Sequence, residues 1–270
     1  MNPGYYPSIP NADYHGGPGV SKSQLDLIDK APALFQWGKA APEDEEHRTA
    51  LVVGDATHAL LLEPDRYLAE FAVGPADSPR NTKAGKERWA AFESTLTGQK
   101  VLMPDEGRKI ALMRESVMAH PQARWLLEAQ GDAEASIYWN DPEHDVLCRC
   151  RPDKVIPGMG WILDVKTTAD MKKFEKSFYD YRYHVQDSFY SDGYANHFGE
   201  DPQGFIFLVV STSIECGKYP VRLFVLDAEG KAVGRDTYNR NLSTYADCMR
   251  TGEWSGIETL SLPYWAKERL

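Results

Sequence analysis

Three residues near the middle of the chain, Asp153, Asp164 and Lys166, have types and a spacing that could do chemistry. Two converging carboxylates suit a hard cation such as Mg²⁺, which proteins hold with one or two carboxylates, water and substrate phosphate oxygens. A lysine beside them could orient an attacking water molecule or offset charge that develops on a phosphate. Together they indicate metal-dependent hydrolysis of phosphodiesters. The alternative is an ordinary ion pair between Asp164 and Lys166 on a solvated strand.

The elements expected around these residues would bring them together. Apolar and β-branched residues predict a hairpin, with two strands and the turn between them at residues 147–156, 161–167 and 157–160. Asp164 and Lys166 stand two apart, so both side chains leave the same face of a strand. Asp153 lies near the middle of the preceding strand. Folding of this hairpin would place the carboxylates of Asp153 and Asp164 across from each other.

A second polar pair follows in the segment 171–197, which is rich in aromatic residues and predicted to be broadly helical. Gln186 and Tyr190 stand four apart and therefore share one helical face. Core packing is the ordinary role of a lone tyrosine. Its pairing with Gln186, at this distance from Lys166, favours contact with DNA or with the active site.

In this order, the motifs P-D, D-V-K and Q-x-x-x-Y resemble the nuclease core of the PD-(D/E)xK superfamily, in the branch shared by the RecB nuclease domain, Cas4-type proteins and exodeoxyribonuclease VIII. Over nearly its whole length the chain is similar to the C-terminal nuclease domain of the exodeoxyribonuclease VIII (RecE-type) family. The resemblance implies an α/β fold with a restriction-endonuclease-like core, in which a central mixed β-sheet is flanked by helices.

The resemblance also implies an activity and an assembly. It implies a 5′-to-3′ exonuclease that acts on double-stranded DNA ends and leaves 3′ overhangs for a single-strand annealing protein in DNA recombination and repair. It further implies a homotetramer, shaped as a ring that encircles DNA. The cofactor would be Mg²⁺, for which Mn²⁺ can substitute.

With the resemblance added, each motif residue receives an expected role. Lys166 would position or activate the attacking water, and Gln186 and Tyr190 would order the site or the DNA strand. The expected metal ligands are Asp153, Asp164, His58 and the backbone carbonyl of Val165.

His58 and Glu134 are candidate metal ligands that each have an alternative role. His58 lies in an apolar helix predicted at residues 51–62, where a lone histidine is more often a core residue. The resemblance places a metal-ligating histidine on an N-terminal helix, so we expect His58 to be a ligand, with Asp55 as the acceptor that orients it. Glu134 lies in a strand predicted at 133–140. It is either a further ligand, as in phage-type exonucleases, or an edge-strand charge.

The chain carries a formal net charge of −10, which predicts weak nonspecific adhesion to DNA and binding confined to one route. Within residues 78–89 this balance is inverted, because four cations stand against one acid. These candidate phosphate contacts are Arg80, Lys83, Lys86 and Arg88. A solvated loop that leads into a helix would explain the same charges.

Length and composition predict one nuclease domain across residues 1–270. Its expected parts are an extended arm, a mainly helical part, a catalytic sheet core and a C-terminal helix with a tail, at about 1–19, 20–130, 131–230 and 231–270. Neither a membrane span nor a signal peptide is found, which favours a cytoplasmic location. The four cysteines lack the flanking pattern of Cas4-type proteins, so no iron–sulfur cluster is expected.

Smaller features complete the expectation. Ser21 and Gln24 match a capping box that opens a helix. Two further strands are predicted at 204–213 and 219–226, and a last helix at about 236–250. Three rival functions stay open at this point: a Cas4-like or other-polarity DNA nuclease, a DNA-binding module of the same fold without catalysis, and a hydrolase of small phosphate esters.

Overall fold

The computed structural model describes residues 1–42, 49–263 and 266. Its main sheet is mixed, with strand order β10-β9-β8-β7-β4. Strands β8 and β9 run parallel, and the other neighbours are antiparallel. The strands are β4 (Asp132–Ala133), β7 (Lys154–Ile156), β8 (Trp161–Thr168), β9 (Gly204–Ser211) and β10 (Val221–Phe224). Both the α/β class and the central mixed sheet are confirmed.

A second, antiparallel sheet has the order β1-β5-β6, with strands at Gly4–Tyr6, Ser136–Asp141 and Val146–Cys150. The prediction of one strand over 147–156 was therefore wrong, because its two halves belong to different sheets. Pro152 lies in the gap between β6 and β7. A proline has no N–H to donate to a β-ladder, so the chain leaves one sheet there and enters the other.

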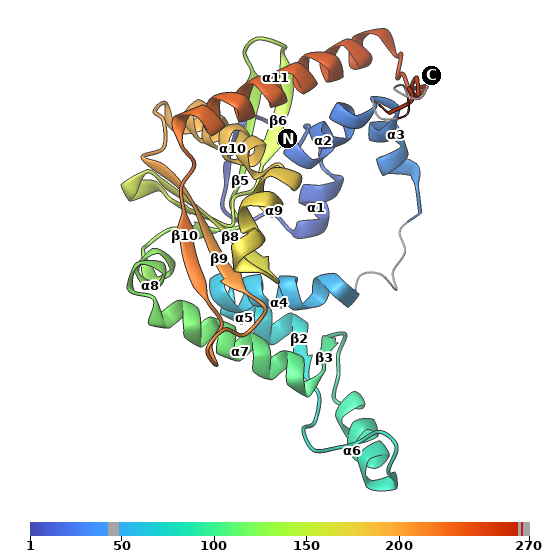
Figure 1. Ribbon diagram of the computed structural model, residues 1–270, viewed down its shortest axis with the longest axis vertical. Coiled ribbons are helices and arrows are strands. Elements are labelled where there is room, and N and C mark those ends of the chain that lie inside the picture. Colours follow the sequence, from blue (N-terminus) through green and yellow to red (C-terminus); the bar gives the residue numbers. More distant parts are fainter. Residues whose placement is uncertain (43–48, 264–265, 267–270) are drawn as a thin grey trace.

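Helices cover both faces of the main sheet, as Figure 1 shows, with α10 and α11 on one side and α7 and α8 on the other. The α-helices are α1 (Asn11–Gly16), α2 (Lys22–Lys30), α3 (Ala33–Ala40), α4 (Thr49–Leu62), α5 (Pro64–Glu70), α6 (Lys83–Glu93), α7 (Pro104–Ala119), α8 (Pro121–Glu128), α9 (Phe174–Asp180), α10 (Tyr183–Phe198) and α11 (Ala228–Thr251). Short 3₁₀ turns lie at Pro157–Met159 and Met171–Lys173. Among these described helices, none is long and apolar enough to cross a membrane.

Alternate side chains of β8 and β9 are buried on opposite faces of the sheet. Ile162 joins the core under α10, whereas Leu163 and Val165 join the core under α7 and α8. On β9, Phe205 and Phe207 likewise face α10. Because both faces are covered, these strands read as nearly continuous apolar runs, and any polar side chain on them is taken out of water.

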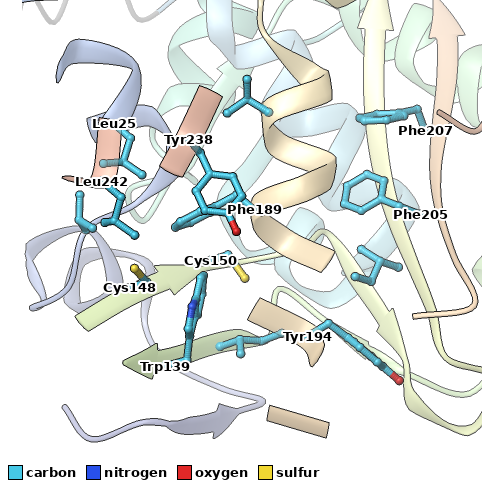
Figure 2. Packing of buried hydrophobic residues seen from close by; sticks show 14 of the residues in the cluster. Leu25, Trp139, Cys148, Cys150, Phe189, Tyr194, Phe205, Phe207, Tyr238 and Leu242 are labelled. Atoms are coloured by element: carbon cyan, nitrogen blue, oxygen red, sulfur yellow. The ribbon is translucent and has the colours of Figure 1, made fainter. Parts of the chain in front are cut away.

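The core under α10 also joins the two sheets, as Figure 2 shows. Phe189 of α10 packs on Trp139 of β5 with ring centroids 4.9 Å apart, and on Tyr238 of α11 at 5.2 Å. Truncating a buried phenylalanine costs about 3–5 kcal/mol of stability, so Phe189 is a principal contact between α10 and the smaller sheet. This packing fixes the position of α10 over β8.

Residues 1–19, which we call the N-terminal arm, are docked against the smaller sheet. Strand β1 pairs with β5, and buried Arg149 on β6 donates to the carbonyls of Tyr14, His15, Gly17 and Pro18. The expectation of an extended arm was therefore incomplete, since the segment contains a strand and the helix α1. A buried guanidinium needs several acceptors, and the arm's carbonyls supply them.

Two helical predictions differ from the structure at their ends. The last helix begins at Ala228, earlier than predicted, because Asp227 caps it by accepting from the N–H of Gly230 at 2.8 Å. The segment 171–197 is divided at Arg182, whose φ of 56° ends α9 and starts α10. The capping box at Ser21 is present, with Gln24 accepting from the Ser21 N–H at 3.0 Å.

One segment extends away from the body of the molecule. Residues 74–99, which we call the α6 projection, connect β2 (Phe71–Val73) to β3 (Lys100–Leu102), and Figure 1 shows α6 at the far end. Trp89 holds this segment together, because its indole N–H donates to the Ser78 carbonyl at 2.9 Å and Gly74 packs on its ring.

Candidate metal centre and nuclease site

Asp164 and Lys166 occupy the face of β8 that α10 covers. Asp164 is 1 % exposed and forms an ion pair with Lys166. Gln186 of α10 donates to the other oxygen of Asp164 at 2.6 Å. Burial raises the pKa of Asp164 to about 6, and nearby Asp153 adds to the rise while Lys166 opposes it. The predicted same-face pair is thus a buried pair with a third partner, and not the solvated pair of the alternative interpretation.

Asp153 lies immediately before β7, in the gap that Pro152 creates. Lys154 of β7 pairs with Leu163 of β8, so the next position along the register puts Asp153 opposite Asp164. One carboxylate oxygen of Asp153 accepts from the N–H of Val165 at 2.6 Å. This bond anchors Asp153 to β8 although Asp153 is in no strand itself. The role of the Val165 carbonyl as a metal ligand stays a prediction.

His58 of α4 and Glu134 complete a cluster with Asp153. The Nδ1 atom of His58 lies 3.4 Å from the same Asp153 oxygen, and one ligand atom each from His58, Glu134 and Asp153 lie within 4.8 Å of one another. Two carboxylates and an imidazole at this separation fit one divalent cation such as Mg²⁺ or Mn²⁺. Asp164 is not part of this close cluster, because its two oxygens face Lys166 and Gln186, and its expected role as a metal ligand stays a prediction.

Glu134 reaches the cluster through an unusual backbone conformation. The predicted strand 133–140 is broken between β4 and β5, where Glu134 has a φ of 53°, in the left-handed region that non-glycine residues rarely adopt. Burial raises the pKa of Glu134 to about 8, with further contributions from Asp153 and Glu63. Acids that are buried next to one another repel each other when ionised, and such clusters are typical of sites that bind a cation.

Two residues of the cluster, His58 and Glu134, line a cleft with two adjoining parts. The larger part has a volume of about 1000 Å³ and is lined by α4, α5 and the N-terminal arm, with His58 and Glu134 among its residues. The smaller part, of about 310 Å³, contains Gln186 and Tyr190. Three residues line both parts: Asn11, Glu134 and Arg151. Gln186 and Tyr190 thus face a common space, as their spacing predicted, and burial raises the pKa of Tyr190 well above its ordinary value.

The predicted partner of His58 was wrong. Asp55 accepts from Arg66 at 2.7 Å and from Lys100 at 2.6 Å, so its carboxylate serves two cations. Asp55 and His58 stand three apart on α4 and are close in space, but Arg66 of α5 and Lys100 of β3 are charged and therefore stronger partners for the Asp55 carboxylate.

The four candidate phosphate-contacting cations lie on the α6 projection and do not line the cleft. Arg80 is paired with Glu93 at 3.3 Å and stacks 3.8 Å from the Trp89 ring, while Lys83, Lys86 and Arg88 are exposed. Their contact with DNA stays a prediction.

Sequence reasoning missed two residues at the junction of the cleft. Arg151 stands two positions before Asp153, and an arginine next to a predicted metal ligand was a signal that could have been used. Asn11 lies in the N-terminal arm, and nothing in its local sequence pointed to the cleft.

The chain matches, over residues 21–258, the sequence profile of a family described as a PDDEXK-like domain of unknown function (DUF3799). The chain belongs to this family. The match supports the PD-(D/E)xK superfamily that the three motifs indicated, and it does not single out exodeoxyribonuclease VIII.

A solved structure has a similar fold. It is a protein of Eubacterium rectale described as a "putative exonuclease", with a TM-score of 0.56 and 12 % sequence identity, and the similarity covers 94 % of this chain and 96 % of that one. At this identity the similarity concerns the fold alone. No curated protein matches the chain.

Proposed function

We propose that this protein is a metal-dependent DNA nuclease, and that it degrades duplex DNA from its ends in the 5′-to-3′ direction. The observation that carries the proposal is the convergence of Asp153, Asp164 and Lys166 with His58 and Glu134 beside a cleft. Membership of a PDDEXK-like family supports hydrolysis of DNA. The 5′-to-3′ direction rests on the resemblance to exodeoxyribonuclease VIII.

Each residue has a physical task in this proposal. Asp153, Glu134 and His58 would hold Mg²⁺, which supplies charge against the phosphate and a water molecule that loses its proton more easily. The Nζ of Lys166 is fixed by Asp164 on the same face of β8, where it can orient the attacking water. Gln186 holds the second oxygen of Asp164 and so keeps that carboxylate in one orientation.

The test uses linear duplex DNA labelled at either the 5′ or the 3′ end, incubated with Mg²⁺ or with EDTA. We expect early, Mg²⁺-dependent release of the 5′ label, no attack on closed circular DNA, and no release by Lys166→Ala. Loss of a general-base or water-orienting group costs about 10²–10⁴-fold in rate. A matched control is Lys176→Ala, which removes an exposed lysine paired with Asp180.

The other outcomes identify the alternatives. Early release of the 3′ label, or preference for single strands, would indicate a nuclease of other polarity or of the Cas4 type. Binding of DNA without release of either label would indicate a non-catalytic module. Hydrolysis of small phosphate esters at a rate that DNA length does not affect would indicate the third rival, a hydrolase of small phosphate esters.

The resemblance further suggests a ring-shaped homotetramer and a single-strand annealing partner. Both belong to this proposal and need their own measurements. Light scattering at several protein concentrations would give the mass of the assembly. A species with the mass of one chain at all concentrations would contradict the tetramer.

A further inference from the structure

At the junction between the two parts of the cleft lies an arginine whose guanidinium keeps part of its hydrogen-bonding capacity. Arg151 lines both parts, together with Asn11 and Glu134. Of the other described cations in the cleft, Arg66 and Lys109 line only the larger part, and Lys22 and Arg149 only the smaller part. A DNA strand that runs past the metal cluster from one part of the cleft to the other would therefore pass Arg151.

Three bonds hold the guanidinium of Arg151 in place. Its Nε donates to the hydroxyl of Ser136 at 2.9 Å, one Nη to the carbonyl of Ile9 at 3.0 Å, and the other Nη to Oδ1 of Asn11 at 3.4 Å. The group also stacks 4.0 Å from the ring of Tyr14. It is thus fixed between strand β5 and the N-terminal arm.

These bonds leave part of the guanidinium unused. An arginine carries five N–H donors and three of them are engaged, so one N–H on each Nη is still able to donate. Two N–H groups on one guanidinium can donate to the two free oxygens of a phosphate diester. The Asn11 amide adds to this, because its oxygen accepts from Arg151 and its NH₂ group remains a donor.

The other arginine of the larger part differs in this respect. Arg66 donates to Asp55, Glu63 and Glu70, so three carboxylates compensate its charge. Within the part of the chain that the structure describes, the hydrogen-bond partners of Arg151 are a hydroxyl, a carbonyl and an amide, which carry no net charge. Glu134 and Glu63 act on Arg151 electrostatically, but no described carboxylate forms a salt bridge with it, so an anion that enters the junction would meet a cation that is not already paired there.

We propose that Arg151, assisted by Asn11, binds a backbone phosphate of the DNA strand next to the scissile phosphate and so positions that strand at the metal cluster. The inference rests on the proposed nuclease function and deepens it by naming the group that holds the substrate. The N-terminal arm lies outside the residues matched by the family profile. By anchoring Arg151, it contributes to substrate binding and not only to the fold.

The experiment compares the native chain with Arg151→Gln, Arg151→Lys and Arg124→Gln. Arg124 is an exposed arginine on α8 that pairs with Glu128 and does not line the cleft, so it serves as the matched control. Binding of a short fluorescent DNA duplex is measured in EDTA over a series of salt concentrations. Initial rates with Mg²⁺ give KM and kcat for each variant.

Losing one phosphate contact lowers the slope of log affinity against log salt by about 0.9. We expect this change in Arg151→Gln, with a KM raised about tenfold and a kcat within about threefold of the native value. Arg151→Lys retains the charge, so its salt slope stays near the native one. Arg124→Gln keeps the native KM, kcat and salt slope.

A purely structural role gives a different result. If Arg151 only tethers the N-terminal arm, Arg151→Gln makes residues 1–19 easier to digest with a protease and leaves the salt slope unchanged, which overturns the inference. Native KM and salt slope in Arg151→Gln, with an active native enzyme, overturn it as well while the nuclease proposal stands. A native chain that neither binds nor cleaves DNA overturns both.

Discussion

Replacing Glu134 by glutamine should stabilise the metal-free protein and weaken its metal binding, two effects of opposite sign from one residue. The carboxyl group of Glu134 is packed near Asp153 and Glu63, and burial raises its pKa from 4.5 to about 8. A raised pKa means that the folded protein prefers the protonated acid. Its contribution to stability is therefore complete below pH 4.5 and is lost as the pH rises towards about 8.

The size of the effect follows from this difference. Each pKa unit corresponds to about 1.4 kcal/mol, so the whole shift sets an upper limit of about 5 kcal/mol. Water reaches the cleft and screens the carboxylate, so we expect a gain of only about 1–2 kcal/mol for Glu134→Gln at pH 8. For a chain of this size that raises the melting temperature by about 2–6 °C.

The assay is thermal unfolding in EDTA at pH 5 and at pH 8, followed by a titration with Mg²⁺ at pH 8. At pH 5 the native chain and Glu134→Gln should have more similar melting temperatures, because Glu134 is then mostly protonated. Added Mg²⁺ should stabilise the native chain in proportion to the logarithm of its concentration, and should stabilise the variant less.

Two results would refute this reasoning. A variant that is no more stable than the native chain at pH 8 in EDTA would show that the Glu134 carboxylate is not repelled by the cluster. An equal response of both proteins to Mg²⁺ would show that Glu134 is not a ligand. Glu134→Gly serves as a second variant, since glycine also relieves the left-handed φ and should be at least as stable as the glutamine variant in EDTA.

Three further outcomes are expected. Gln186→Ala frees one oxygen of Asp164 and should lower the rate of DNA hydrolysis about 10–100-fold in steady-state kinetics. Gln186→Glu should be slower still, because two carboxylates would then face each other. Native rates in both variants would contradict a role of Gln186 in holding Asp164. Lys154→Met should lower the stability measured by thermal unfolding by about 1–3 kcal/mol, because Lys154 donates to three carbonyls at the end of α8. The rate of DNA hydrolysis per folded molecule should stay native. A reduced rate in a variant that remains stable would place Lys154 in the active site. Arg149→Ala should release the N-terminal arm, so that a protease cuts within residues 1–19 at least about tenfold faster. An unchanged rate of cleavage would mean that the pairing of β1 with β5 alone holds the arm.

Local pattern was sufficient for the parts of the site that lie on one element. The alternation of β8 placed Asp164 and Lys166 on one face, and the helical spacing of Gln186 and Tyr190 placed both towards one cleft. The apolar runs of β8 and β9 likewise predicted strands within a buried sheet. These features depend on periods of two and 3.6 residues, which any reader of the sequence can count.

Contacts between distant elements could not be derived in this way. Local spacing suggested Asp55 as the partner of His58, but Arg66 and Lys100 compete for Asp55 from α5 and β3. The predicted strand 147–156 looked continuous, and only the pairing of its two halves with different sheets showed that Asp153 stands between them.

The sequence by itself determined the motif residues of β8 and α10, because strand and helix periods are local, and the fold class followed from the family resemblance that these motifs carry. Only the tertiary structure placed Glu134 beside the expected ligands His58 and Asp153, and only it showed that Arg151 and Asn11 join the two parts of the cleft. These residues come from separate segments, and each has an ordinary local environment in sequence. Their meeting depends on how two sheets, α4 and the N-terminal arm pack, and that is a property of the whole chain.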